Sequence, residues 1–293
     1  MLQGSLVALV TPFNPDGGIN FPKLGELLEF HIKNGTDGIV ILGTTAEATT
    51  LSLQEQEDIV RFSVDVVGRR VPIIVGAGSN DTLAAVNKAR LFSSLGADYL
   101  LVITPYYNKT NDEGLIKHFE VIAQSSLVPI ILYNVPSRTG MSIPASVISR
   151  LSQHPNIYGI KEASGNMSYA ASISKYLSDD FIMLSGNDDI IVPMMSIGAK
   201  GVISVLANIC PRGVSDICHY ALDGNFYKAN NIAKSLLDVA NALFYETNPI
   251  PVKEAMNYLG FNVGGFRLPL YQMGPDNYRR LIDVIDRNKE WLY

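Results

Sequence analysis

Short runs of apolar residues, many of them β-branched, recur along the chain between segments with helical periodicity. Each run is continuous instead of alternating with polar residues, which is typical of a strand buried on both faces of a parallel sheet. Eight such runs are present, at residues 5–13, 38–45, 71–78, 99–107, 129–136, 157–164, 181–188 and 201–208.

The segments between the runs show the period of amphipathic helices. Leu115, Phe119 and Ile122, for example, fall at positions i, i+4 and i+7, which places them on one helix face. Ser52 followed by Glu55 is the pattern of a capping box at a helix start. Glycines that are typical of helix ends stand just before the next strands, at Gly35, Gly68, Gly96 and Gly198.

Strand and helix alternate eight times, which predicts an α/β fold with a parallel sheet and crossover helices. Over residues 1–224 this pattern favours a closed (β/α)8 TIM barrel. An open doubly wound sheet is the alternative, but the eight similar runs include no obvious edge strand. After Gly224 the alternation stops, and three further helices are predicted at 225–246, 251–260 and 275–292. Because no Pro/Gly-rich linker precedes them, we expect residues 225–293 to pack on the barrel as a C-terminal helical extension.

Composition excludes several classes of partner. The chain has 293 residues, a formal net charge of −5 and no run of basic residues, so nucleic acid and anionic membranes are poor candidates. No apolar run reaches the ~18 residues of a membrane span, and the N-terminal stretch lacks the cationic lead of a signal peptide. We therefore expect a cytoplasmic protein. Cys210 and Cys218 make no disulfide framework, and the four scattered histidines have no metal-ligand spacing, so we expect neither a metal nor another cofactor.

Lys161 ends the apolar run that begins at Ile157, where an ammonium group is costly to bury. One interpretation is that its side chain reaches back to solvent from the strand end. The other follows from the barrel, in which side chains at the carboxyl ends of the strands face the active site. Desolvation there lowers the ~10.4 pKa of a lysine, and the neutral amine attacks a carbonyl to form a Schiff base. We favour the second interpretation.

Other strand ends offer partners for this chemistry. Tyr133 lies on the neighbouring strand and is a candidate acid and base, and the hydroxyl groups of Thr44 and Tyr107 extend a chain toward it. Core packing is the alternative for a tyrosine on a strand. Arg138 is a candidate anion clamp, because a guanidinium binds a carboxylate with two parallel bonds; a solvated loop arginine is the alternative. Backbone amides of residues 43–48 are candidates for holding a carboxylate.

The residues above and the motifs around them resemble the dihydrodipicolinate synthase family, within the pyruvate-dependent class I aldolases. The resemblance covers nearly the whole chain, and its motifs occur in family order: GTTAE at 43–47, TPYYNK at 104–109, YNVPSRTG at 133–140, GIKEASGN at 159–166 and LSGND at 184–188. It implies an enzyme that condenses pyruvate with L-aspartate 4-semialdehyde to give 4-hydroxy-tetrahydrodipicolinate, on the route through diaminopimelate to lysine.

The resemblance also implies catalytic roles. Lys161 forms an imine and then an enamine with pyruvate. Tyr133 donates and accepts protons, and Thr44 and Tyr107 complete its relay. Tyr107 reaches into the site of a neighbouring subunit, which implies a homo-oligomer, either a dimer or a tetramer.

Substrate-binding residues follow from the same resemblance. Thr45 and its backbone hold the carboxylate of pyruvate, and Arg138 receives the carboxylate of the semialdehyde. Gly186 and Ile203 line the pyruvate pocket.

Two departures from the family pattern concern a loop and a regulatory site. The family has glycine and serine where this chain has Ala46 and Ala48, and alanine is strained if position 46 needs a positive φ. Glu47, beside a helix start, is expected to be structural.

The lysine-feedback site of sensitive members uses a serine, two histidines and a glutamate where this chain has Ala48, Leu53, Gln56 and Ala84, with Asn80 and Tyr106 retained. Without a carboxylate for the ammonium group of lysine, we expect weak or absent lysine inhibition.

Two other functions stay open. N-acetylneuraminate lyases and 2-keto-3-deoxygluconate-type aldolases share the barrel, the Schiff-base lysine and the tyrosine, and the fold alone does not separate them. Arg138 and the Thr44–Thr45 pair favour the synthase, because a sugar chain needs hydroxyl partners instead of a cation. The second alternative is a non-catalytic barrel that senses pyruvate-like ligands, and the complete set of four catalytic candidates argues against it.

Overall fold

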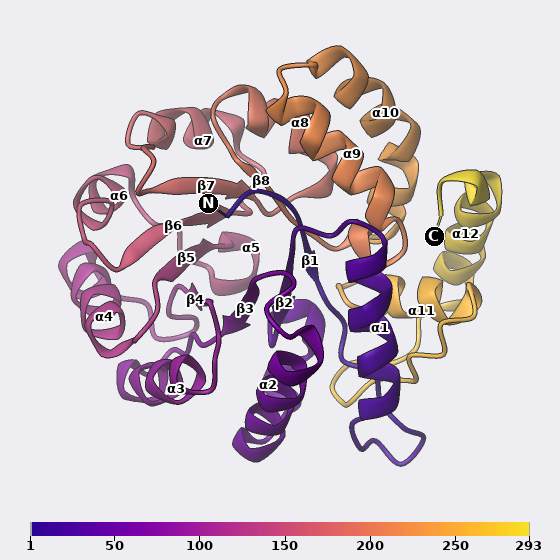
Figure 1. Ribbon diagram of the computed structural model, residues 1–293, viewed down its shortest axis with the longest axis horizontal. Coiled ribbons are helices and arrows are strands. Elements are labelled where there is room, and N and C mark those ends of the chain that lie inside the picture. The colour runs from indigo at the N-terminus through magenta and orange to yellow at the C-terminus, as the bar shows by residue number, and fades with distance from the viewer. Residues whose placement is uncertain (1, 293) are drawn as a thin grey trace.

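Eight parallel strands form a closed barrel at the centre of the protein (Figure 1). The computed structural model describes residues 2–292, and strand order follows the sequence, with β1 paired to both β2 and β8. The strands are β1 (Gly4–Ala8), β2 (Gly38–Ile41), β3 (Ile73–Gly76), β4 (Tyr99–Ile103), β5 (Ile130–Asn134), β6 (Ile157–Glu162), β7 (Ile182–Ser185) and β8 (Gly201–Ser204). Each overlaps one of the apolar runs, so the predicted barrel is confirmed and the open sheet is wrong.

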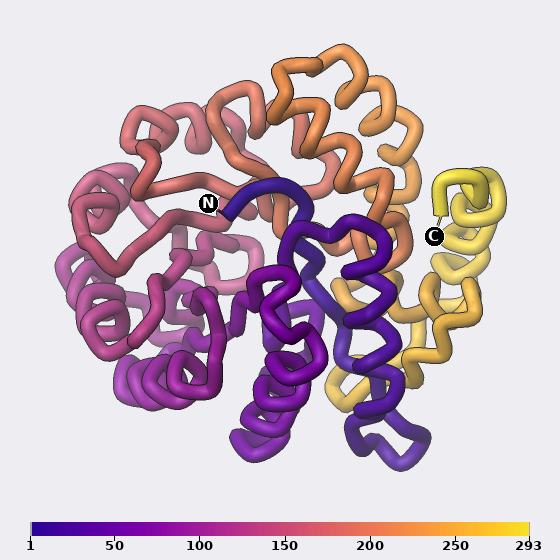
Figure 2. The backbone as a smooth tube through the Cα atoms, in the orientation of Figure 1, coloured from indigo at the N-terminus to yellow at the C-terminus, as the bar shows by residue number. Residues whose placement is uncertain are grey.

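Helices surround the barrel (Figure 2). Those from α1 to α8 lie between successive strands, and α9 to α12 follow β8. They are α1 (Phe21–Lys33), α2 (Leu53–Val67), α3 (Thr82–Ser94), α4 (Asp112–Ser125), α5 (Pro136–Thr139), α6 (Ala145–Leu151), α7 (Met167–Ser174), α8 (Ile191–Ser196), α9 (Pro211–Leu222), α10 (Phe226–Ala242), α11 (Ile250–Tyr258) and α12 (Pro275–Arg287). The predicted capping box of Ser52 and Glu55 is confirmed at the start of α2. Within residues 2–292, no helix has both the length and the apolar character of a membrane span.

Two hydrophobic clusters form the core. The inner cluster fills the barrel with side chains such as Leu6, Ile74 and Leu184, and the outer cluster lies between the strands and the helices. Leu236 of α10 and Leu281 of α12 belong to the outer cluster. The C-terminal helices therefore share a core with the barrel, and we propose residue 224 as the boundary between the barrel and its extension.

The side-chain alternation of β6 shifts at Tyr158, where its register with β5 changes by one residue. Tyr158 packs against the inner cluster, whereas Ile160 belongs to the outer one. Lys161 consequently faces the barrel interior and lines a cavity there. Strict alternation from an inward Tyr158 would have turned Lys161 outward, so this bulge decides which way the amine points.

His31 is a titratable group enclosed by the packing of α1. Its side chain is fully buried, its Nδ1 lies 3.2 Å from Thr36 Oγ1, and its Nε2 has no hydrogen-bond partner among residues 2–292. Burial lowers the pKa of His31 from 6.5 to about 3, because the charged imidazole would lose its hydration. The folded chain thus keeps His31 neutral at acidities at which the unfolded chain protonates it.

We predict that acid destabilises the fold partly through His31. Between roughly pH 6 and pH 4 the unfolded state binds one more proton at this group, so the free energy of unfolding falls by up to ~1.4 kcal/mol for each pH unit of acidification. His31→Gln should remove this contribution from the slope of stability against pH, measured by urea unfolding at several pH values. Thr36→Val keeps the histidine and should retain the slope. An unchanged slope in His31→Gln would contradict the prediction.

Candidate active site

A cavity of about 340 Å³ opens at the carboxyl ends of the strands. It brings together residues from β5, β6 and the segments that follow β2, β5 and β7. Six of the eight predicted site residues line it: Thr44, Thr45, Tyr133, Arg138, Lys161 and Gly186. Residues far apart in the sequence therefore meet in one place, as the barrel requires.

Two predicted residues do not line this cavity within the described chain. Ile203 is buried in the inner cluster beside Leu6 of β1, and Val205, just past the end of β8, lines the cavity instead. Tyr107 is 93% exposed and has a φ of 69°. Its side chain is thus available for contacts with another chain, and it does not join Thr44 and Tyr133 of its own chain.

Lys161 and Tyr133 are direct neighbours in the sheet. They are paired residues of β6 and β5, and each is only 7% exposed. The Lys161 Nζ lies 4.5 Å from the centroid of the Tyr133 ring. The Tyr133 side chain therefore lies beside the amine, where its hydroxyl group is a candidate proton donor and acceptor for a substrate bound to Lys161.

Gly186 gives the Lys161 side chain its room. A Cβ at this position would lie 2.4 Å from the Cβ of Ala163 and 3.0 Å from the Cε of Lys161. The first distance is shorter than any real contact, so a larger residue would displace the end of β6. Glycine is needed here because of close packing, with no demand on backbone conformation.

Neither Glu47 nor Glu162 lines the cavity, although Glu47 follows β2 and Glu162 is the last residue of β6. Glu162 is buried on the other face of β6, where it accepts hydrogen bonds from Asn134 Nδ2 at 2.6 Å and from the backbone N–H of Ser164 at 2.7 Å. Burial raises the pKa of Glu162 and these hydrogen bonds oppose the rise. Glu162 therefore joins the ends of β5 and β6 without facing the substrate space.

The sequence interpretation missed the wall formed between α10 and α11. Phe244, Glu246, Thr247 and Asn248 line the cavity from this segment. Asn248 Nδ2 donates to Thr45 Oγ1 at 3.0 Å, and its backbone carbonyl accepts from Arg138 Nη2 at 2.9 Å. One residue thus orients both candidate carboxylate-binding side chains. The only signal in the sequence is a short polar stretch before Pro249, which does not by itself indicate a site.

Asp188 is a second missed residue, and it organises the end of β8. One carboxylate oxygen accepts from the backbone N–H groups of Val205 and Leu206 at 3.0 and 2.9 Å. Burial raises the pKa of Asp188, and the positive charge of Lys161 opposes that rise. The carboxylate is close enough to Lys161 to influence its electrostatic environment.

The loop that carries Thr44 and Thr45 is fixed by a buried ion pair behind it. Glu47 accepts a hydrogen bond from Lys253 Nζ at 2.8 Å, and neither side chain is exposed. Lys253 also donates to the backbone carbonyl of Thr11 at 3.2 Å. Burial lowers the pKa of Lys253, and the Glu47 carboxylate counteracts this effect. These contacts agree with the expected structural role of Glu47.

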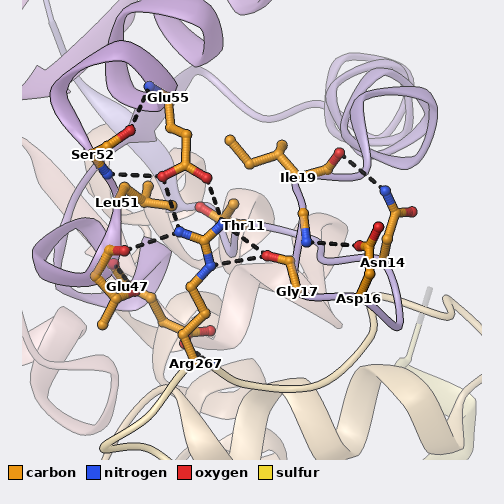
Figure 3. Close-up of polar contacts among 12 residues, drawn as sticks. Thr11, Asn14, Asp16, Gly17, Ile19, Glu47, Leu51, Ser52, Glu55 and Arg267 are labelled. Atoms are coloured by element: carbon orange, nitrogen blue, oxygen red, sulfur yellow. Dashed lines mark hydrogen bonds and ion pairs between the residues drawn. The ribbon is translucent and has the colours of Figure 1, made fainter.

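Arg267 extends this support to the surface of the barrel end (Figure 3). Its backbone N–H donates to Glu47 at 3.1 Å, and its guanidinium lies between the Glu55 carboxylate and the Gly17 carbonyl.

The positive φ in the loop that carries Thr44 and Thr45 occurs at Glu47, at 55°, while Ala46 lies in a 3₁₀ turn. Alanine at position 46 is therefore accommodated without the strain that the family pattern suggested.

No group of three or more His, Cys, Asp or Glu residues within 2–292 is arranged to hold a metal ion. Cys210 and Cys218 are both buried and free.

Comparisons with known proteins cover the full length of the barrel. The model of the dihydrodipicolinate synthetase family matches residues 1–288. The chain is 49% identical over 288 residues to the 4-hydroxy-tetrahydrodipicolinate synthase of Thermoanaerobacter sp. (strain X514), covering 98% of this chain and 97% of that protein. It is 50% identical over 281 residues to 4-hydroxy-tetrahydrodipicolinate synthase 1 of Clostridium acetobutylicum, covering 96% of each.

Solved structures give the same result. Dihydrodipicolinate synthase from Aquifex aeolicus superposes with a TM-score of 0.96 at 44% identity and covers 99% of both chains. The chloride-inhibited dihydrodipicolinate synthase from Acinetobacter baumannii, solved in complex with pyruvate, superposes with a TM-score of 0.96 at 39% identity over 99% of both chains.

We predict that breaking the Glu47–Lys253 pair costs far more than breaking an exposed pair. Lys253→Met leaves a buried carboxylate without its counter-charge, and the free energy of unfolding should fall by ~3–5 kcal/mol in urea denaturation. Glu57→Gln, which removes the exposed i,i+4 pair with Arg61, is the matched control and should cost less than ~1 kcal/mol. Equal losses in the two variants would show that the buried pair is not a major constraint on the fold.

Proposed function

The chain belongs to the dihydrodipicolinate synthetase family and is a lyase of the class I aldolase type that forms 4-hydroxy-tetrahydrodipicolinate, and we propose that it does so through a Schiff base between Lys161 and pyruvate. The second substrate is L-aspartate 4-semialdehyde, and the product leads through diaminopimelate to lysine. The observation that carries this proposal is a buried amine at the mouth of the barrel, 4.5 Å from the centroid of a tyrosine ring and within a cavity also lined by Arg138.

The covalent steps begin with attack of the neutral Lys161 amine on the keto carbon of pyruvate. Loss of water gives the imine, and loss of a proton from the methyl carbon gives the enamine. The enamine carbon then bonds to the aldehyde carbon of the semialdehyde, whose oxygen takes up a proton. Tyr133 is the donor and acceptor for these transfers, because its hydroxyl-bearing ring lies directly beside Lys161. Cyclisation through the substrate amino group releases the lysine.

Two positions in the cavity suit the two substrate carboxylates: one offers backbone amides and a hydroxyl group, and the other offers a guanidinium. Thr45 and the backbone of its 3₁₀ turn hold the carboxylate of pyruvate, and the hydrogen bond from Asn248 fixes the Thr45 hydroxyl. Arg138, anchored through one nitrogen to the Asn248 carbonyl, keeps its remaining donors for the carboxylate of the semialdehyde. Gly186 leaves the space for the imine beside Lys161. A sugar-acid substrate would need hydroxyl partners in place of the guanidinium.

Tyr107 takes part in the reaction only when copies of the chain associate. Its 93% exposure in a single chain and its place in the loop after β4 suit a side chain that completes the Thr44–Tyr133 relay of a neighbouring copy. We infer a homo-oligomer on this basis, either a dimer or a tetramer. The two free thiols suit a reducing compartment such as the cytoplasm.

We predict that pyruvate and borohydride together modify Lys161. Reduction traps the imine as a stable secondary amine, so mass spectrometry of digested protein should locate the adduct on the peptide that contains Lys161. Lys161→Ala should form no adduct and should lose synthetic activity by roughly a thousandfold or more. Lys200→Ala is the control, because Lys200 directly precedes β8 at the opposite end of the barrel. This variant should still form the adduct at Lys161 and should keep its synthetic activity. An unmodified wild-type chain would remove the Schiff-base proposal.

We also predict that L-lysine inhibits weakly or not at all. The cavity formed by Ala48, Leu53, Gln56 and Tyr106 has no carboxylate among its lining residues and instead includes Lys88 and Arg138, so an incoming ammonium group meets repulsion. L-Lysine should reduce the rate no more than L-norleucine, which lacks the side-chain ammonium, when both are titrated at subsaturating pyruvate. A micromolar inhibition constant for L-lysine would contradict this expectation.

A further inference from the structure

The active-site cavity has a single carboxylate on its walls. Lys161 and Arg138 are its two cations, and Glu246 is the only acidic residue in its lining among residues 2–292. Glu246 lies between α10 and α11, two residues before Asn248. In the proposed mechanism each substrate carboxylate has a partner, whereas the α-ammonium group of L-aspartate 4-semialdehyde has none.

The Glu246 side chain is held in place through one of its two oxygens. Its Oε1 accepts a hydrogen bond from the backbone N–H of Gly274 at 3.0 Å and another from Asn277 Nδ2 at 2.9 Å, at the start of α12. Its Oε2 has no hydrogen bond or ion pair with any residue in 2–292. The side chain is half-buried. One oxygen therefore fixes the side chain, and the other is left for a ligand of the cavity.

Arg138 and Glu246 are placed to bind a single α-amino acid group together. Arg138 Nη2 donates to the backbone carbonyl of Asn248, and two residues of chain, at most ~7 Å, separate Glu246 from Asn248. Arg138 and Glu246 form no ion pair with each other. The carboxylate and the ammonium group of an α-amino acid are bonded to the same carbon, so their partners must lie close together. The cavity offers a cation for the first group and an anion for the second.

Asn248 offers a further acceptor for an ammonium group. Its side chain lines the cavity and is only 6% exposed. Its Nδ2 is engaged by Thr45, whereas its Oδ1 has no hydrogen-bond partner among residues 2–292. Buried polar oxygens are rarely left without a partner in folded proteins. An ammonium group has three N–H donors, so it can be shared between this oxygen and the Glu246 carboxylate.

We propose that Glu246 determines specificity for the second substrate, with its Oε2 pairing with the α-ammonium group of L-aspartate 4-semialdehyde while Arg138 binds the α-carboxylate. This inference rests on the proposed function, because it takes that semialdehyde as the substrate. Pyruvate carries no ammonium group, so formation of the imine at Lys161 does not depend on Glu246. An aldehyde that lacks the amino group gains nothing from Glu246 and is bound less tightly.

The test compares Glu246→Gln with the wild type in steady-state kinetics of the full chain. The amide oxygen of glutamine still accepts from Gly274 and Asn277, so the variant loses the charge and keeps the contacts to α12. We expect the KM for L-aspartate 4-semialdehyde to rise about tenfold or more, because a hydrogen bond between charged groups is lost. The KM for pyruvate and the borohydride-trapped adduct at Lys161 should not change.

Glu254→Gln is the matched control for a purely structural role. Glu254 Oε1 accepts a hydrogen bond from the backbone N–H of Met273 at 3.3 Å, next to the residue that Glu246 contacts, but Glu254 does not line the cavity. This variant should keep both KM values. Glu246→Asp keeps the negative charge and should retain a KM for the semialdehyde close to that of the wild type.

The probe 4-oxobutanoate separates recognition of the ammonium group from a general disturbance of the site. It is the same semialdehyde without the amino group, so its inhibition constant should be equal in the wild type and in Glu246→Gln. The proposal would be overturned by an unchanged KM for L-aspartate 4-semialdehyde in Glu246→Gln, by an equal rise in Glu254→Gln or Glu246→Asp, or by a parallel weakening of 4-oxobutanoate. A wild type that forms neither adduct nor product would overturn the proposed function, and this inference with it.

Discussion

The Schiff-base chemistry that we propose for this barrel depends on the direction of one side chain. Lys161 faces the interior because β6 carries an extra residue at Tyr158, which shifts the alternation of the strand by one. Tyr158 fills the inner cluster below, and Lys161 opens the cavity above it. Without that shift the amine would face the outer cluster of helix-packing residues, where no substrate could reach it. Gly186 complements the shift by leaving space beside the lysine.

The rest of the site is held from outside the strands. Thr44 and Thr45 lie on a loop that also contains Glu47, and Glu47 is fixed by the buried Lys253 of α11. Asn248, also from the C-terminal extension, orients Thr45 and Arg138. The extension is therefore part of the active site as well as of the core, and the barrel alone would lack both its rear support and one wall of its cavity.

The sequence by itself determined the eight strands, the barrel and the capping box, because apolar continuity and local capping depend on neighbouring positions. It also singled out Lys161 as the candidate nucleophile, because a lysine at the end of an apolar strand is unusual. Tertiary structure alone decided the inward turn of Lys161, since a one-residue bulge leaves the apolar pattern of IYGIK unchanged. It also decided the partners Asn248, Lys253 and Asp188, because hydrogen bonds between residues separated by up to 242 positions have no local signature. The exposure of Tyr107 likewise depends on how distant segments pack.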